Sequence, residues 1–125
     1  MTELIFDGLL RGSAAVASVA VGGVYPVALP KDQTIWPAIH YLFVGGSNMP
    51  TADTYGIQRQ RVEVSCWAKS YYDAVTLRNT VTAALLAASS PAFNIALIQN
   101  IDFDEHEDLL YRALVEFYVT ATFTS

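Results

Sequence analysis

The chain has 125 residues with 12 acidic and 7 basic side chains, which gives a formal net charge of −5. Its pI of about 4.7 excludes a basic nucleic-acid-binding domain, and 53% hydrophobic residues with only 15% charged ones exclude a disordered chain. We expect one domain over residues 1–125. The net charge is local, because five acids and no Lys or Arg lie between Asp102 and Asp108, and the other residues carry equal numbers of acids and bases.

Cys66 is the single cysteine, so neither an internal disulfide nor a cysteine-rich metal site is expected. The most apolar stretch, Ala14–Pro30, is interrupted by four residues: Ser18, Gly22, Gly23 and Pro26. A membrane span needs about 20 apolar residues in a row, and Glu3 and Asp7 stand where a signal peptide would carry basic residues. We expect a soluble protein made in the cytoplasm, with no membrane partner.

The first predicted element is a helix that begins at Thr2, a suitable N-cap, with Glu3 near the positive end of the helix dipole. Its imperfect apolar stripe consists of Leu4, Ile5, Leu9, Val16 and Val19. Gly22-Gly23 provides a stop for this helix. Val24–Pro30 is then a short extended segment, in which two prolines exclude a central strand.

Ala38–Val44 is an apolar run of strand length that follows Pro37. The next segment, Gly45–Gly56, consists largely of turn-forming and small polar residues. It is longer than a tight hairpin turn requires, so we expect a loop. Loops of this length are usually functional or mobile.

Ile57–Lys69 shows the clearest strand pattern. One face is apolar, formed by Val62, Val64, Cys66 and Ala68, and the other carries Arg59, Arg61, Glu63, Ser65, Trp67 and Lys69. Ser70, with Asp73 three residues later, predicts the start of a second helix. That helix has one apolar face, formed by Ala74, Leu77, Val81, Leu85 and Ala88, and ends before Pro91.

Phe93–Phe103 and Leu109–Thr124 are the last predicted strands, joined by a turn in the acidic segment. In the final strand, alternate residues from Tyr111 to Phe123 share an apolar face. The order helix, strands, helix, strands predicts an α+β fold. We expect an antiparallel sheet of about four or five strands, packed on one face by two α-helices.

The acidic segment around His106 contains oxygen and nitrogen ligands of the kind that hold metal ions. It lacks the central Gly and the distant bidentate Glu of an EF-hand loop, and alternate residues on a strand would point to opposite faces. We therefore expect no metal site. The segment is instead a solvated turn or a charged contact surface with four candidate residues: Asp104, Glu105, Glu107 and Asp108.

The residues do not indicate catalysis. A Ser, Thr or Cys nucleophile needs a base within reach, and the two histidines are His40 in an apolar strand and His106 among acids. Cys66 lies on an apolar strand face, where a buried thiol is expected, and the glycine pairs lack the spacing of a phosphate-binding loop. We expect neither an enzyme nor a cofactor. An enzyme would need His40 or Cys66 in an open pocket beside a carboxylate.

Trp67 lies on the polar face of its predicted strand, directly followed by Tyr71 and Tyr72. Such an aromatic group indicates a binding patch, because exposed apolar surface marks interfaces. A helix that covers this face would explain it equally well.

Three groups of segments form a combined pattern. They are Gly22-Gly23-Val24-Tyr25-Pro26 with Leu29-Pro30 and Trp36-Pro37-Ala38-Ile39-His40-Tyr41, then Arg61–Tyr71 with Ala74 and Leu77, and finally Leu110-Tyr111-Arg112 with alternating apolar residues to Phe123. In this order and spacing the chain resembles the tail terminator (tail-to-head joining) family of long-tailed bacteriophages, prophages and gene-transfer particles, a family of tail completion proteins. The resemblance covers nearly the whole chain and is strongest over Val62–Ala74.

The resemblance implies a structural protein that forms a ring, usually of six subunits, on the head-proximal end of the tail tube. The ring would end polymerisation of the tube protein and present a surface to the head connector, while DNA passes through its lumen without specific binding. Such a subunit makes heterologous contacts around a closed rotation. The predicted loop would then be an assembly loop that orders on docking, with five candidate residues: Gly45, Asn48, Met49, Asp53 and Tyr55.

A second hypothesis is another neck or head-completion adaptor on the same α+β scaffold, which would bind the portal side and not the tube. The acidic segment also has two possible roles. Acids that face the lumen would repel DNA, or the acids would contact a basic partner ring and set its docking register.

Overall fold

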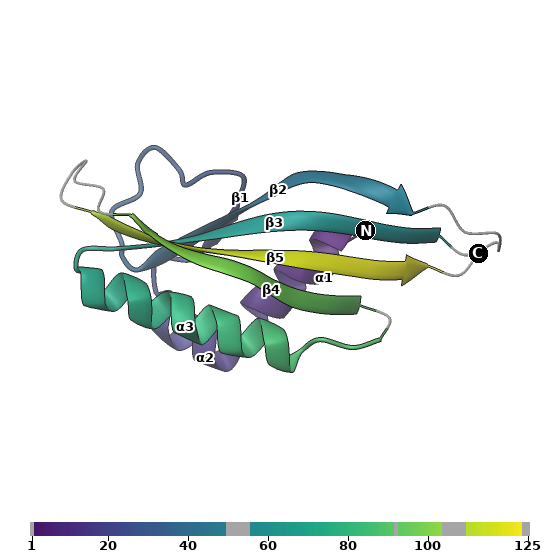
Figure 1. The fold of residues 1–125 in the computed structure, drawn as a ribbon. Helices are drawn as coiled ribbons and strands as arrows, with labels where there is room; N and C mark the ends of the chain where they lie inside the picture. Colours follow the sequence, from purple (N-terminus) through teal and green to yellow (C-terminus); the bar gives the residue numbers. More distant parts are fainter. Residues whose placement is uncertain (1, 50–55, 92, 104–109, 124–125) are drawn as a thin grey trace.

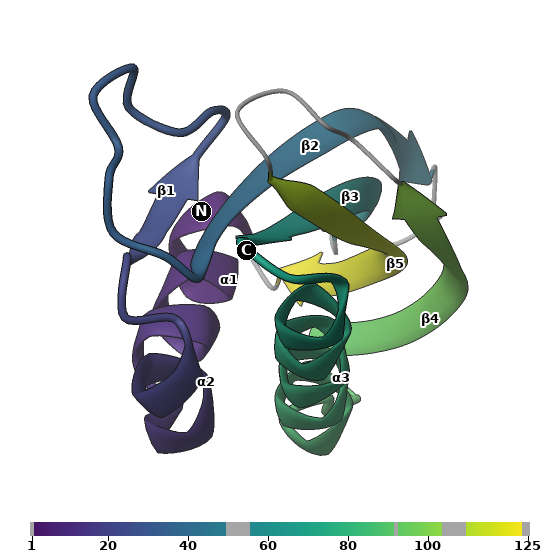
Figure 2. The same ribbon diagram turned by 90° about the vertical axis from the view of Figure 1, so that its left-hand side faces the viewer.

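The computed structural model describes residues 2–49, 56–91, 93–103 and 110–123. These residues form eight elements: α1 (Thr2–Arg11), α2 (Ala14–Val19), β1 (Val24–Pro26), β2 (Ala38–Met49), β3 (Gly56–Ala68), α3 (Tyr71–Ala87), β4 (Phe93–Phe103) and β5 (Tyr111–Phe123). The strands form one sheet in the order β1-β2-β3-β5-β4, and the helices lie together on one side of it (Figure 1; Figure 2). The α+β prediction is confirmed.

The sheet is mixed, which corrects the expectation of a purely antiparallel one. The pairs β2–β3, β3–β5 and β5–β4 are antiparallel. β1 instead pairs parallel with β2, from Val24 opposite Ile39 to Pro26 opposite Tyr41. A parallel pair needs a longer connection than a hairpin turn, and residues 27–37 supply it. Pro26 ends β1 at the edge of the sheet, as the position of the prolines predicts.

The N-terminal helix expected from the sequence is two helices, so three helices and not two cover the sheet. Gly12 follows α1, and the Ser13 side chain accepts a hydrogen bond from the Val16 N–H at 3.3 Å, so Ser13 caps a new helix. α2 ends at Val19, before the glycines that were expected to stop it. A Cβ on Gly22 would collide with the Ile35 carbonyl, so this glycine permits close passage of two backbone segments.

α3 begins as the sequence predicts. The Ser70 hydroxyl oxygen accepts a hydrogen bond from the Asp73 N–H at 3.1 Å. Its predicted apolar face is buried at Ala74, Leu77, Val81 and Leu85.

The core lies between the helices and the sheet. The predicted apolar faces of β3 and β5 are both buried there, at Val62, Val64, Cys66 and Ala68 and at Ala113, Val115, Phe117, Val119 and Ala121. Phe6, Leu10 and Val16 close the core from the N-terminal helices. Burial of this apolar surface is the main source of stability for the fold.

The predicted loop Gly45–Gly56 is wrong in its extent. β2 continues through Met49 and β3 begins at Gly56, with Gly46 paired to Gln60 and Met49 to Ile57. The register shifts between Phe43 and Gly46, where the strand is irregular. A segment of poor strand propensity becomes a strand here because its strongly strand-forming partner, β3, supplies the hydrogen bonds.

Candidate assembly surfaces

The candidate assembly residues belong to the β2–β3 hairpin. Gly45, Asn48 and Met49 lie in β2 and not in a loop, while Asp53 and Tyr55 lie outside the described residues. This end of the sheet, which we call the hairpin end, holds the end of β2, the start of β3 and the end of β5, since Gly56 pairs with Phe123.

Asp104, Glu105, Glu107 and Asp108 also lie outside the described residues, in the connection between β4 and β5. Phe103 pairs with Arg112, and Arg112 pairs with Trp67, so β4 ends and β5 begins where β3 ends. We call this the junction end. β5 has 13 residues, so the two ends are about 40 Å apart at roughly 3.3 Å per residue. The described strands that flank the two sets of candidate residues therefore end at opposite ends of the sheet.

The face of the sheet away from the helices, the open face, carries the polar residues of the two central strands. They are Arg59, Arg61, Glu63, Ser65 and Trp67 of β3, and Arg112, Glu116, Tyr118 and Thr120 of β5, with the apolar Leu114 among them. The helices pack on the opposite face, through Val62, Val64 and Cys66. The hypothesis that a helix covers Trp67 is therefore wrong.

Trp67 belongs to a cluster of four side chains near the junction end. Its indole N–H donates to His40 Nδ1 at 2.9 Å, and the two rings stack with centroids 6.1 Å apart. Arg112 Nε donates to the Ser65 hydroxyl at 3.1 Å, and its guanidinium carbon lies 5.4 Å from the Trp67 ring centroid. Burial, and then the charge of Arg112, lower the pKa of His40 to about 4. His40 is therefore neutral at pH 7, which leaves Nδ1 able to accept the indole hydrogen bond.

A second cluster lies on the open face toward the hairpin end. The guanidinium of Arg59 lies over the Tyr118 ring, 3.8 Å from its centroid. Arg61 is paired with Tyr118 in the register, and its Nε is buried without a hydrogen-bond partner among the described residues. Tyr, Trp and Arg are the residue types enriched at protein interfaces.

Two acids lie between these clusters. Glu63 is directly opposite Glu116 across the β3–β5 pair, and Glu116 is only 7% exposed. Like charges in directly opposite positions destabilise a sheet. Along its length the open face is thus cationic at Arg59 and Arg61, anionic at its centre, and cationic again at Arg112.

The junction end also exposes aromatic residues at the start of α3. Tyr72 is 77% exposed and Tyr71 is 50% exposed, with the Tyr71 ring edge-on to Tyr111 at 6.4 Å. Beside them is a hollow of about 390 Å³, lined by Thr34, Ile35, Trp36, Pro37, Lys69 and Asp73. The predicted aromatic group is therefore divided between the open face, which holds Trp67, and this end, which holds the two tyrosines.

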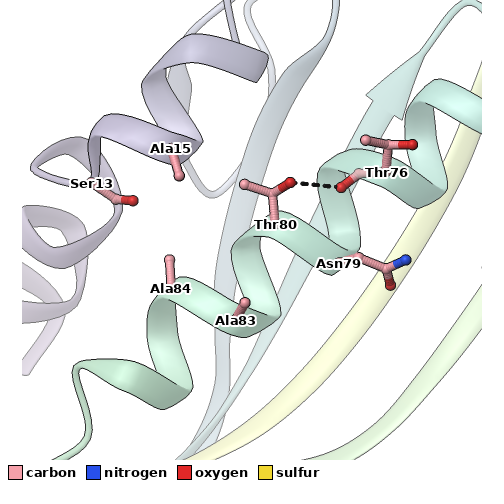
Figure 3. Close-up of a pocket in the computed structure, with 7 residues that line it drawn as sticks. All are labelled: Ser13, Ala15, Thr76, Asn79, Thr80, Ala83 and Ala84. Carbon is pink, nitrogen blue, oxygen red and sulfur yellow. Dashed lines mark hydrogen bonds between the residues drawn. The ribbon is translucent and has the colours of Figure 1, made fainter.

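A further hollow, of about 600 Å³, lies between α2 and α3 on the side of the helices away from the sheet. Figure 3 shows that only small, hydroxyl and amide side chains line it: Ser13, Ala15, Thr76, Asn79, Thr80, Ala83 and Ala84. The Thr80 hydroxyl donates to the Thr76 carbonyl at 2.9 Å. Sequence reasoning missed this surface, although the absence of Lys, Asp and Glu from Ala74–Ala88 was a visible signal.

The two described candidates for catalysis, His40 and Cys66, are occupied or buried. Cys66 is fully buried, and burial raises the pKa of its thiol, so the thiol stays protonated. The Nδ1 atom of His40 accepts the Trp67 hydrogen bond. Within the described ranges, three or more His, Cys, Asp or Glu side chains do not gather in a metal-binding arrangement. Among the described helices, none is long and apolar enough to cross a membrane.

Comparison with solved structures gives a match in fold. A chain described as "Virion of native gene transfer agent (GTA) particle" matches with a TM-score of 0.72 at 16% identity, over 94% of this chain and 92% of that chain. At that identity the likeness shows a shared fold. A comparison with curated proteins gave no match.

The sequence itself gives the family. Residues 8–121 match the family model described as "Tail completion protein gp17". The chain therefore belongs to the tail completion family, as the resemblance of its segments predicts, and it is a structural protein of a phage-like virion.

Proposed function

We propose that the protein caps the head-proximal end of the tail tube as a ring of six subunits, ends tube polymerisation and provides the docking surface for the head connector. Its partners are further copies of itself, the tail tube protein and the head connector, while DNA passes through the lumen without specific binding. Membership of the tail completion family supports a role at the end of the tail.

The observation that supports this proposal is that the strands flanking the two candidate segments end at opposite ends of the sheet. The β2–β3 hairpin lies at one end, and the connection with the acidic residues joins the sheet at the other. A ring between a tube and a head needs two chemically different surfaces that face opposite ways. A subunit with its strands roughly along the ring axis would present them.

We assign the acidic segment to a contact with a basic partner ring. The aromatic residues at the junction end support this role over a lumen lining, because exposed Tyr71 and Tyr72 beside a hollow suit a protein partner. Acids next to such a patch would set the docking register.

The ring is tested by negative-stain imaging of the purified protein mixed with tail tube protein. We expect rings at one end of each tube and no further elongation of capped tubes. Tubes that continue to grow without terminal rings contradict the proposal. The alternative, a neck adaptor on the same scaffold, predicts binding to the head connector with tube growth unchanged.

The role of the acidic segment is tested in the same system with the triple variant Asp104→Asn/Glu105→Gln/Glu107→Gln. We expect normal tube capping and loss of head joining, since the basic partner loses its counter-charges. The exposed Asp32→Asn variant is the control and should join heads normally. Normal head joining by the triple variant, with DNA retained in the lumen, would support the lumen role instead.

A further inference from the structure

The charged residues of the sheet are on its central strands and not on its edges. β3 carries Arg59, Arg61 and Glu63, and β5 carries Arg112 and Glu116. β2 has no Asp, Glu, Lys or Arg in Ala38–Met49, and β4 has only Asp102, near its end. Proteins that remain monomeric usually place charges, above all Lys, on edge strands to prevent pairing with other chains. This sheet has the reverse distribution.

One free edge belongs to β2. β1 covers only Ile39–Tyr41, and the Val27 N–H then donates to the Tyr41 carbonyl at 2.7 Å. From Leu42 to Met49 no described strand pairs with the outer side of β2. This stretch can therefore accept another strand.

The other free edge belongs to β4, the last strand of the sheet. Its first outward amides are already satisfied, because the Phe93 N–H donates to the Ser90 carbonyl at 3.1 Å and the Ile95 N–H to the Ser89 hydroxyl at 2.9 Å. Beyond Ile95 no described group outside the sheet bonds to this edge. Leu97 is 43% exposed there, and Asn100 is also exposed.

We infer that the free part of β4 in one copy pairs with the free part of β2 in the next copy, so that the sheet continues from subunit to subunit. This inference rests on the proposed ring and names its contact. Main-chain hydrogen bonds would provide the affinity, as in other cases of strand addition. Two different edges make the contact heterologous, which is the kind that closes into a ring.

Strand direction is consistent with this pairing. Three antiparallel steps separate β2 from β4, so the two edges run in opposite directions. Copies related by rotation about an axis along the strands would therefore join antiparallel. Each edge has one irregularity, between Phe43 and Gly46 and between Leu97 and Gln99, and such bulges disfavour pairing with an arbitrary strand.

A matched pair of lysine substitutions tests the β4 edge. Gln99→Lys places a charge on the free part of the edge, and Asn94→Lys places the same charge, on the same face, on the part that Ser89 and Ser90 already cap. Asn94→Lys gives up only the 3.4 Å hydrogen bond from the Asn94 side-chain amide to the Ser89 hydroxyl. Both positions are exposed, so both variants should fold and keep the thermal stability of the wild type. We expect Gln99→Lys to need at least about tenfold more protein for ring formation on tubes, because a buried unpaired charge is costly, and Asn94→Lys to behave as the wild type.

Cross-linking tests the contact directly. A Leu42→Cys/Gln99→Cys variant places both cysteines on the open face, because Leu42 pairs with Glu63 and Gln99 with Glu116. In a Cys66→Ala background it cannot close a disulfide within one chain, because three strand spacings, about 14 Å, exceed the roughly 7 Å that a disulfide spans. Oxidation in the presence of tubes should give a ladder of oligomers only with both cysteines. Moving the second cysteine to Ala96, on the same face, reads the register, and Leu97 and Asn100, which pair with core residues on the opposite face, are the control positions.

The outcomes separate this inference from the proposed function. Rings that form equally well with Gln99→Lys, and no ladder from any cysteine pair, overturn edge pairing and leave the capping ring intact. Absence of rings from the wild type overturns the capping function and edge pairing together. A ladder from the Leu42→Cys single variant would show edges paired with themselves, which also overturns the heterologous contact.

Discussion

The two faces of the sheet differ in what holds their side chains in place. On the helix-covered face, Val64, Phe117 and Val119 are fully buried among apolar neighbours. On the open face, Trp67 and Arg112 are held by directional contacts, and Glu116 lies opposite the like charge of Glu63. The first face stabilises the subunit, and the second has the composition of an interface. Within β5, for example, Phe117 packs in the core while its neighbour Tyr118 lies on the open face.

The largest expected effect comes from substituting adjacent residues of β5 that face opposite ways. Phe117→Ala should lower the free energy of unfolding by about 3–5 kcal/mol, because it removes a fully buried aromatic side chain. Tyr118→Ala should cost only about 1 kcal/mol, the size of its contact with Arg59. Urea unfolding followed by circular dichroism measures both. Equal losses in the two variants would mean that the two faces contribute alike to the subunit.

A smaller effect concerns pH and the His40 cluster. Burial lowers the pKa of folded His40 to about 4, so between pH 6.5 and 4 the unfolded chain binds more protons than the folded one, and stability falls as the pH is lowered. His40→Asn keeps an acceptor for the Trp67 N–H but does not titrate. Between pH 7 and 4.5 the free energy of unfolding should therefore fall further in the wild type than in the variant. Because His40 is partly exposed, we expect this difference to be about 1 kcal/mol.

The measurement is urea unfolding of wild type and His40→Asn at several pH values, with Trp fluorescence as the probe. The difference between the two proteins removes the contribution of the carboxylates, which titrate in both. Parallel stability curves over this range would show that His40 is protonated in the folded state as readily as in the unfolded one.

The smallest effect is expected at the centre of the open face. Glu63→Gln removes one of two charges in directly opposite positions and should raise the free energy of unfolding by roughly 0.2–1 kcal/mol. Asp32→Asn, an exposed acid outside the sheet, is the control, with a change within about 0.5 kcal/mol. A loss of stability in Glu63→Gln would mean that a neighbouring Arg stabilises this carboxylate more than Glu116 destabilises it.

Much of the fold could be predicted because local patterns and tertiary structure agree. The alternation in β3 and β5, the Ser70 cap of α3 and the strand Phe93–Phe103 all follow from side-chain spacing, and the structure confirms them. The N-terminal region was predicted less well. The apolar stripe predicted one helix, and the structure has two. Gly12 and the capping residue Ser13 separate them, but the stripe continues across both helices.

The candidate surfaces were predicted only in part. The sequence placed Trp67 on a polar strand face, but whether a helix covers that face depends on which side α3 packs against. The extent of β2 could not be predicted either, because Gly45–Met49 becomes a strand only through hydrogen bonds to β3.

The sequence by itself determined α3, β3, β4 and β5, the buried faces of β3 and β5, and the concentration of net charge between Asp102 and Asp108. These features depend on residues near one another in the chain. Only the tertiary structure decided the strand order, the parallel pairing of β1 and the separation of the hairpin end from the junction end. It also decided that the uncharged strands are the edges. Those features arise from pairing between distant segments, and no local pattern specifies which strand lies beside which.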